Sequence, residues 1–101
     1  MEYQIEMLQT TFERDPAMVA RRVAGEIVLV PIKPKISGDP SLYTLDEAAA
    51  FLWEKIEQGV TGQDLIEELL SRYEASQEQA NQDVRNLVEE LLSIEAIRVK
   101  I

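Results

Sequence analysis

Cysteine and histidine are both absent from this chain of 101 residues. Without cysteine the chain has no disulfides, thiolate nucleophiles or cysteine metal sites, and without histidine it lacks the commonest general base and metal ligand. A metal site would need carboxylates alone, but the adjacent pairs Glu67 and Glu68, and Glu89 and Glu90, diverge around a helix. We therefore expect no catalytic residues, no metal and no cofactor, and the chain is not predicted to be an enzyme.

Long apolar runs and phosphate-binding loops are missing as well. No apolar stretch approaches the roughly 18 residues that a membrane helix needs, and the opening residues MEYQIEM lack the basic and apolar regions of a secretory signal. Only four glycines are present, and neither Gly25 nor Gly38 belongs to a glycine-rich phosphate loop. These absences predict a cytoplasmic protein without membrane contact.

Positive charge is scarce, since 10 lysines and arginines stand against 19 aspartates and glutamates and leave a formal net charge of −9. A surface that binds nucleic acid neutralises phosphates with lysine and arginine, so this balance disfavours nucleic acid as a partner. An acidic excess commonly serves solubility alone, and it also suits a basic or neutral partner. With 46% hydrophobic residues, the chain has the composition of one globular domain.

Short strands are expected in the first half of the chain and at its end. Residues 18–23 and the β-branched run 26–32 flank a turn at Ala24 and Gly25, which predicts a hairpin. A third short strand is expected at 42–44, and the alternation at 97–101 predicts a last strand. Residues 1–13 alternate weakly, which suits a short strand or a tail that becomes ordered only in an oligomer.

The stretch 45–59 organises the chain, because its apolar residues recur at the three-and-four spacing of an amphipathic helix. Asp46 is expected to cap the start of this helix, and Gly59 to end it in the left-handed conformation. The only tryptophan, Trp53, lies on the apolar stripe. We expect the other elements to pack around it.

Two further helices are predicted after this one. Thr61 and Asp64 have the spacing of a capping box, and the helix they open continues to about Tyr73. Ser76 and Gln79 repeat the device at the start of the third helix, whose apolar stripe ends near Leu91.

A short sheet followed by three helices is the order of a winged helix-turn-helix domain. Within that order, residues 13–97 contain a characteristic set of positions: Leu45, Asp46, Glu47, Ala48, Ala49, Leu52, Trp53, Gly59, Thr61, Leu65, Ile66, Leu69, Tyr73, Asp83, Val84, Leu91 and Ile97. In this pattern the chain resembles the PqqD-like family of peptide-recognition domains, also called RiPP recognition elements. The resemblance implies an α+β fold in which a small N-terminal antiparallel sheet packs on a three-helix bundle.

The same resemblance implies one domain over residues 1–101, with its core at 14–97 and a flexible or oligomer-pairing segment at 1–13. The sequence also departs from the family pattern. Glu95 stands where the family often has glycine, and Asp46 stands where it often has asparagine. Glu95 and Ala96 do not reproduce the glycine-aromatic pair of members dedicated to pyrroloquinoline quinone biosynthesis, which leaves the pathway open.

The function that the resemblance implies is that of a non-catalytic adaptor. Such a protein binds the leader of a ribosomally made precursor peptide and presents it to a modifying enzyme, often a radical S-adenosylmethionine (SAM) enzyme. Strand addition is expected at an edge formed by Leu42, Tyr43 and Thr44, against a helical wall formed by Val84, Arg85, Val88 and Leu91. The aliphatic members of that wall also suit the core, and Arg85 also suits a surface ion pair.

Two alternatives remain open from the sequence. The same helix order suits a winged-helix regulator that binds nucleic acid, and a structural or oligomerisation module would pair residues 1–11 with a second copy in a homodimer. The sequence names neither the precursor nor the partner enzyme.

Overall fold

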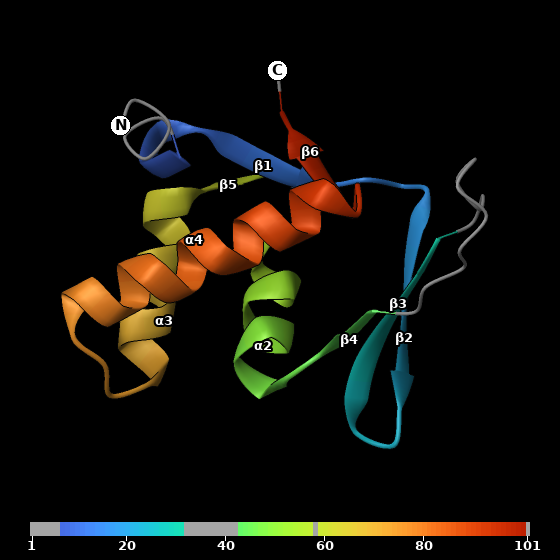
Figure 1. Cartoon of the computed structure of the whole chain (residues 1–101), viewed down its shortest axis with the longest axis horizontal. Helices are drawn as coiled ribbons and strands as arrows, with labels where there is room; N and C mark the ends of the chain where they lie inside the picture. The colour runs from blue at the N-terminus through green and yellow to red at the C-terminus, as the bar shows by residue number, and fades with distance from the viewer. Residues whose placement is uncertain (1–6, 32–42, 58, 101) are drawn as a thin grey trace.

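Two small antiparallel sheets and three helices contain most of the residues that the structure describes, and Figure 1 shows their arrangement. This computed structural model describes residues 7–31, 43–57 and 59–100. The first sheet has the order β2-β3-β4, made of β2 (Met18–Val23), β3 (Glu26–Pro31) and β4 (Tyr43–Leu45). The second has the order β5-β1-β6, made of β5 (Val60–Thr61), β1 (Thr11–Arg14) and β6 (Ile97–Val99). The helices are α2 (Glu47–Lys55), α3 (Gly62–Arg72) and α4 (Gln77–Ser93).

The predicted α+β fold, a small antiparallel sheet on three helices, is confirmed. The hairpin of β2 and β3 turns at Ala24 and Gly25, whose φ angles of 52° and 84° are both positive, as a two-residue turn between twisted strands requires. β3 ends at Pro31, which has no N–H for a further ladder bond. The predicted third strand is β4, which in the described residues spans Tyr43–Leu45, while Leu42 lies outside them.

Each helix begins where a side chain caps it. Asp46 accepts a hydrogen bond from the Ala49 amide at 2.8 Å, which opens α2. Thr61 and Asp64 form the reciprocal capping box of α3, with bonds of 3.0 and 3.1 Å. Ser76 likewise accepts from the Gln79 amide at 3.0 Å and opens α4. All three predicted caps are therefore confirmed, because each satisfies amides that the first helical turn leaves without a partner.

The predicted end of the first helix is wrong. α2 stops at Lys55, and the next residue, Ile56, is fully buried with a φ of −87°. The Ile56 amide donates to the carbonyl oxygens of Leu52 and Trp53, and the bond to Trp53 tightens the last turn. The helix therefore ends at a buried apolar residue, before the glycine. Gly59 has a φ of +128° and belongs instead to the turn into β5.

The end of α4 uses a left-handed residue that is not glycine. Glu95 has a φ of 59°, its amide bonds to the Leu92 carbonyl oxygen at 3.0 Å, and the Ala96 amide bonds to that of Leu91 at 2.8 Å. These two bonds form a Schellman motif, in which glycine is the favoured residue because it has no Cβ to strain. Glu95 thus holds a left-handed conformation that glycine adopts more readily.

The second sheet was not predicted. β1 pairs with β6 on one side and β5 on the other, and it buries Phe12, which is 2% exposed. Met7 is also buried, at 6% exposed. The expected core boundary at residue 14 therefore falls at the end of β1, and residues 7–13 belong to the folded part. Most of the expected N-terminal alternation, including Tyr3 and Ile5, lies outside the described residues.

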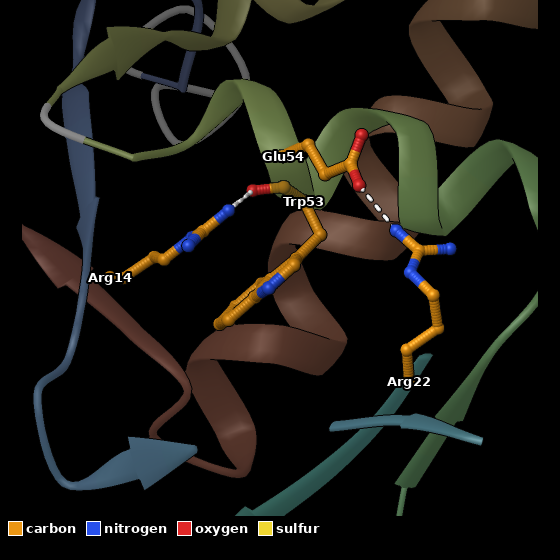
Figure 2. Close-up of polar contacts among 4 residues, drawn as sticks. All are labelled: Arg14, Arg22, Trp53 and Glu54. Carbon is orange, nitrogen blue, oxygen red and sulfur yellow. Dashed lines mark hydrogen bonds and ion pairs between the residues drawn. The ribbon is translucent and has the colours of Figure 1, made fainter. Parts of the chain in front are cut away.

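The core forms around α2, as the position of the tryptophan predicted. Trp53 is 1% exposed and belongs to one cluster of buried side chains that all three helices and both sheets supply. The Arg14 guanidinium lies 4.7 Å from the centre of the Trp53 ring and donates to its carbonyl oxygen from Nε and Nη2, at 3.2 and 2.8 Å. Figure 2 shows Arg14 reaching α2 from one side and Arg22, which bonds Glu54 at 2.7 Å, from the other.

These two arginines differ in how much stability they should supply. Replacing Arg14 with alanine removes a cation–π contact and two partly buried bonds, so we expect the free energy of unfolding to fall by about 1–3 kcal/mol. Replacing Arg22 with alanine breaks an ion pair whose side chains are 61% and 53% exposed, and should cost less than about 0.5 kcal/mol. Urea unfolding followed by Trp53 fluorescence measures both, and equal losses would contradict the role given to Arg14.

The left-handed end of α4 gives a second prediction. Glu95→Gly should be more stable than Glu95→Ala by about 1 kcal/mol, because both lose the carboxylate but only glycine relieves the strained φ. The comparison of two variants removes the effect of other contacts made by the Glu95 side chain. Thermal unfolding of the pair tests it, and an alanine variant as stable as the glycine variant would refute the strain.

Candidate functional site

A groove with a volume of about 340 Å³ lies between β4 and α4. It is lined by Tyr43, Thr44, Leu45, Asp46, Ala48, Ala49, Leu52, Leu69, Asp83, Asn86, Leu87 and Glu90. One wall is the edge of the first sheet, because β3 pairs with β4 on one side and no other strand in the described ranges pairs with it on the other. The groove therefore combines an open backbone edge with a helical wall.

The strand wall of the groove is short, and the burial of its side chains differs from one residue to the next. β4 pairs Tyr43 with Leu29, Thr44 with Val28 and Leu45 with Ile27. Leu45 is 2% exposed and anchors the strand in the core, whereas Thr44 is exposed. In such a pair every second residue directs its N–H and C=O away from the neighbouring strand, so β4 can accept an additional strand.

The floor of the groove is apolar because small residues of α2 face it. Ala48 and Ala49 line the groove and are half-buried, and their methyl groups are too short to fill it. Leu52, Leu69 and Leu87, one from each helix, lie below. An alanine pair thus leaves room that a larger residue would fill, and the leucines make that room suitable for an apolar side chain.

The helical rim of the groove is acidic. Asp83, Asn86 and Glu90 follow one another at three- and four-residue spacing and so share one side of α4. Asp83 accepts a hydrogen bond from the Gln79 side chain at 2.8 Å. No described lysine or arginine lines the groove.

Tyr43 connects the two walls. Burial raises the pKa of the Tyr43 hydroxyl to about 12, and a hydrogen bond to the Glu90 carboxylate, its negative charge and that of Asp46 act in the same direction. The neutral hydroxyl of β4 therefore meets an acceptor on α4 across the groove.

The structure places the predicted site residues differently. Tyr43 and Thr44 line the groove, and Leu42 lies outside the described residues. Val84, Val88 and Leu91 are at most 1% exposed and belong to the core, which was the alternative role that the sequence allowed them. That these predicted residues bind a peptide stays a prediction.

Arg85 lies away from the groove, on another side of α4. It borders a small hollow with Met7, Phe12 and Val99, and its Nε is buried without a hydrogen-bond partner among the described residues. The expected surface ion pair is therefore not formed within the described ranges. A helix turns by about 100° per residue, so the buried stripe of α4 lies between Arg85 and the residues that line the groove.

The sequence did not predict the residues of α4 that line the groove, because the strongest apolar stripe of that helix was assigned to the groove wall. That stripe enters the core, and the groove is lined by the positions next to it, Asp83, Asn86, Leu87 and Glu90. Leu87 gave a usable signal, since it is an apolar residue on the margin of the stripe with polar neighbours at i−4, i−1 and i+3. Its exposure of 7% agrees with that marginal place.

A wider hollow of about 720 Å³ lies on another side of α2. Ala50 and Phe51 line it, together with Arg72 and Tyr73 from the end of α3. Phe51 packs edge-on against Tyr73, with ring centres 6.1 Å apart. Ala49 and Ala50 therefore face different surfaces, and this separation is useful for controls.

The family profile described as Coenzyme PQQ synthesis protein D (PqqD) matches residues 26–97, which is most of the chain. The chain belongs to the PqqD family. Among solved structures, this PqqD-family protein is similar to TbiB1 in complex with the TbiA(beta) leader peptide, with a TM-score of 0.71 and 19% identity over 85% of this chain and 94% of that one.

It is also similar to lasso peptide synthetase B1 complexed with the leader peptide, with a TM-score of 0.69 and 23% identity over 86% of this chain and 96% of that one. At these identities the two structures show that the fold is shared. Among curated proteins no match was found. No group of metal-binding side chains and no helix able to span a membrane occurs in the part of the chain that the structure describes.

The contact across the groove predicts a pH dependence. The Tyr43 hydroxyl has an ordinary pKa of 10.0 and a folded pKa of about 12, so its contribution to stability is complete below pH 10 and is lost as the pH rises to 12. Over that range the parent should lose more unfolding free energy than Tyr43→Phe, measured by urea unfolding at each pH. Parallel losses in the two proteins would show that Tyr43 titrates normally.

Proposed function

We propose that this PqqD-family protein is a non-catalytic adaptor that binds the leader segment of a ribosomally made precursor peptide and presents the peptide to a modifying enzyme. The leader adds as a strand to the open edge of β4 and places apolar side chains on the floor of the groove. The radical SAM class, which the family resemblance implies, is the first class of partner enzyme to examine.

The observation that carries this proposal is the groove itself. A strand edge to which no other described strand pairs lies beside an apolar floor, and both are needed for an extended peptide to bind by backbone and side chain together. Support also comes from the two similar folds, each of which was solved with a leader peptide.

The magnitudes are adequate for such binding. Several backbone hydrogen bonds at about 0.5–1.5 kcal/mol net each and two buried side chains at about 1.5–3 kcal/mol each offset the ordering of a flexible peptide. The result is compatible with micromolar affinity, about −8 kcal/mol. Holding the core peptide beside an enzyme then raises its effective concentration to about the millimolar range, which requires no catalytic group on the adaptor.

The nucleic-acid alternative is weakened by the charge of α4, the third helix in winged-helix order. Arg85 is its only basic residue, against Glu78, Asp83, Glu89 and Glu90. A helix of this charge repels the phosphates of a duplex, and α4 offers no basic stripe to bind them.

A titration with a labelled leader peptide tests the proposal. The probe is the synthetic leader of the precursor encoded beside the gene for this chain, and fluorescence anisotropy should report binding in the micromolar range. Ala49→Phe should weaken that binding by about tenfold or more, or about 1.4 kcal/mol, because the ring occupies the floor that the leader needs.

Ala50→Phe provides the matched control. Ala50 is the next residue of α2, has the same side chain and faces the other hollow, so its replacement should leave the affinity within about twofold. Circular dichroism and unfolding establish that both variants fold. Absence of binding at tens of micromolar in the parent, or equal effects of the two replacements, would refute the proposed site.

A further inference from the structure

The groove has a charge pattern that its role in binding a peptide backbone does not require. Asp46, Asp83 and Glu90 supply three carboxylates to its lining, and no described lysine or arginine belongs to that lining. By contrast, the hollow on the other side of α2 has a lining of both signs, in which Arg22, Lys55 and Arg72 lie among carboxylates. The cavity and the strand edge define the site, and these carboxylates give its rim a negative charge.

The hydrogen-bond and ion-pair partners of these three carboxylates indicate which of them can contact a ligand. The carboxylate of Asp46 already caps α2. Among the described residues, Asp83 accepts a side-chain hydrogen bond from the neutral Gln79 amide, and Glu90 faces the neutral hydroxyl of Tyr43. Ion pairs in the described ranges join Arg22 to Glu54, Lys55 to Glu68 and Arg98 to Glu13, so neither rim carboxylate has a cationic partner there.

The dimensions of the rim fit side chains of an added strand. Asp83 and Glu90 are seven residues apart on α4, which corresponds to about 10.5 Å along the helix. Side chains on one face of a strand repeat about every 6.6 Å, so residues two or four positions apart can reach these two carboxylates. A lysine or arginine can lay its apolar stem on the floor beside Leu87 and keep its charged end at the rim.

We propose that the groove selects leader segments that carry an apolar anchor and at least one lysine or arginine on the same face of the added strand. Glu90 is the principal determinant of this selectivity and Asp83 is the second. The inference rests on the proposed function, since it names the class of leader that the groove accepts. The acidic charge of the rim attracts such a segment and rejects one with glutamate or aspartate at the same position.

A displayed library of random 12-residue peptides tests this selectivity with the full chain as bait. Enriched peptides should carry lysine or arginine two or four positions from an apolar residue. A synthetic, fluorescein-labelled version of the most enriched peptide should bind Asp83→Asn/Glu90→Gln about five- to tenfold more weakly than the parent in low salt, with a smaller difference in 0.5 M salt.

Glu89→Gln is the matched control, because Glu89 is the neighbouring carboxylate of α4 and lines the hollow near Val99 instead of the groove. Its affinity for the peptide should stay within about twofold of the parent. Charge exchange adds a gain of function: Glu90→Lys should prefer the peptide in which the basic residue is replaced by glutamate, reversing the preference of the parent.

The outcomes separate the two proposals. Enriched peptides without basic residues, or equal affinities of the parent and the double variant, would overturn the selectivity and leave peptide binding intact. A library that yields no binding peptide would count against the proposed function and against this inference with it. Basic enrichment together with the reversed preference of Glu90→Lys would establish the role of the rim.

Discussion

The contact between Arg14 and Trp53 joins the two halves of this fold. Arg14 comes from the second sheet, whereas Trp53 belongs to the helix that follows directly from the first sheet. The guanidinium covers the indole ring and also donates to a carbonyl of the last turn of α2, so one side chain fixes both the face and the end of that helix. Because α2 also contributes Ala48, Ala49 and Leu52 to the groove, this contact acts on the same helix that forms the floor of the site.

The groove results from a compromise between packing and openness. Leu45 and Leu52 anchor β4 and α2 in the core. The alanines between them are too small to fill the groove that lies over α2. A longer edge strand would offer more backbone bonds to a ligand, but it would also expose a surface prone to pairing with other chains. The described edge strand, β4, has three residues and faces acidic side chains of α4, so it offers little backbone for unspecific pairing.

Local signals predicted the parts of the fold that depend on neighbouring residues. The caps at Asp46, Thr61 and Ser76 were correct because a cap bonds amides within three residues of itself. The second sheet was missed, since β1 finds its partners about 50 and 85 residues further along the chain and its four residues are too few to show a period. For the candidate site, the open strand edge was predicted, but the face of α4 was assigned one residue away from the positions that line the groove.

By itself, then, the sequence determined the helix starts, the hairpin turn, the acidic balance and the order of elements that marks the family, because each is written in residues close together in the chain. The tertiary structure alone decided where α2 ends, which residues form the second sheet and which side of α4 faces the groove. Those features depend on which apolar side chains win places in a shared core, and that competition is settled only when distant segments pack together.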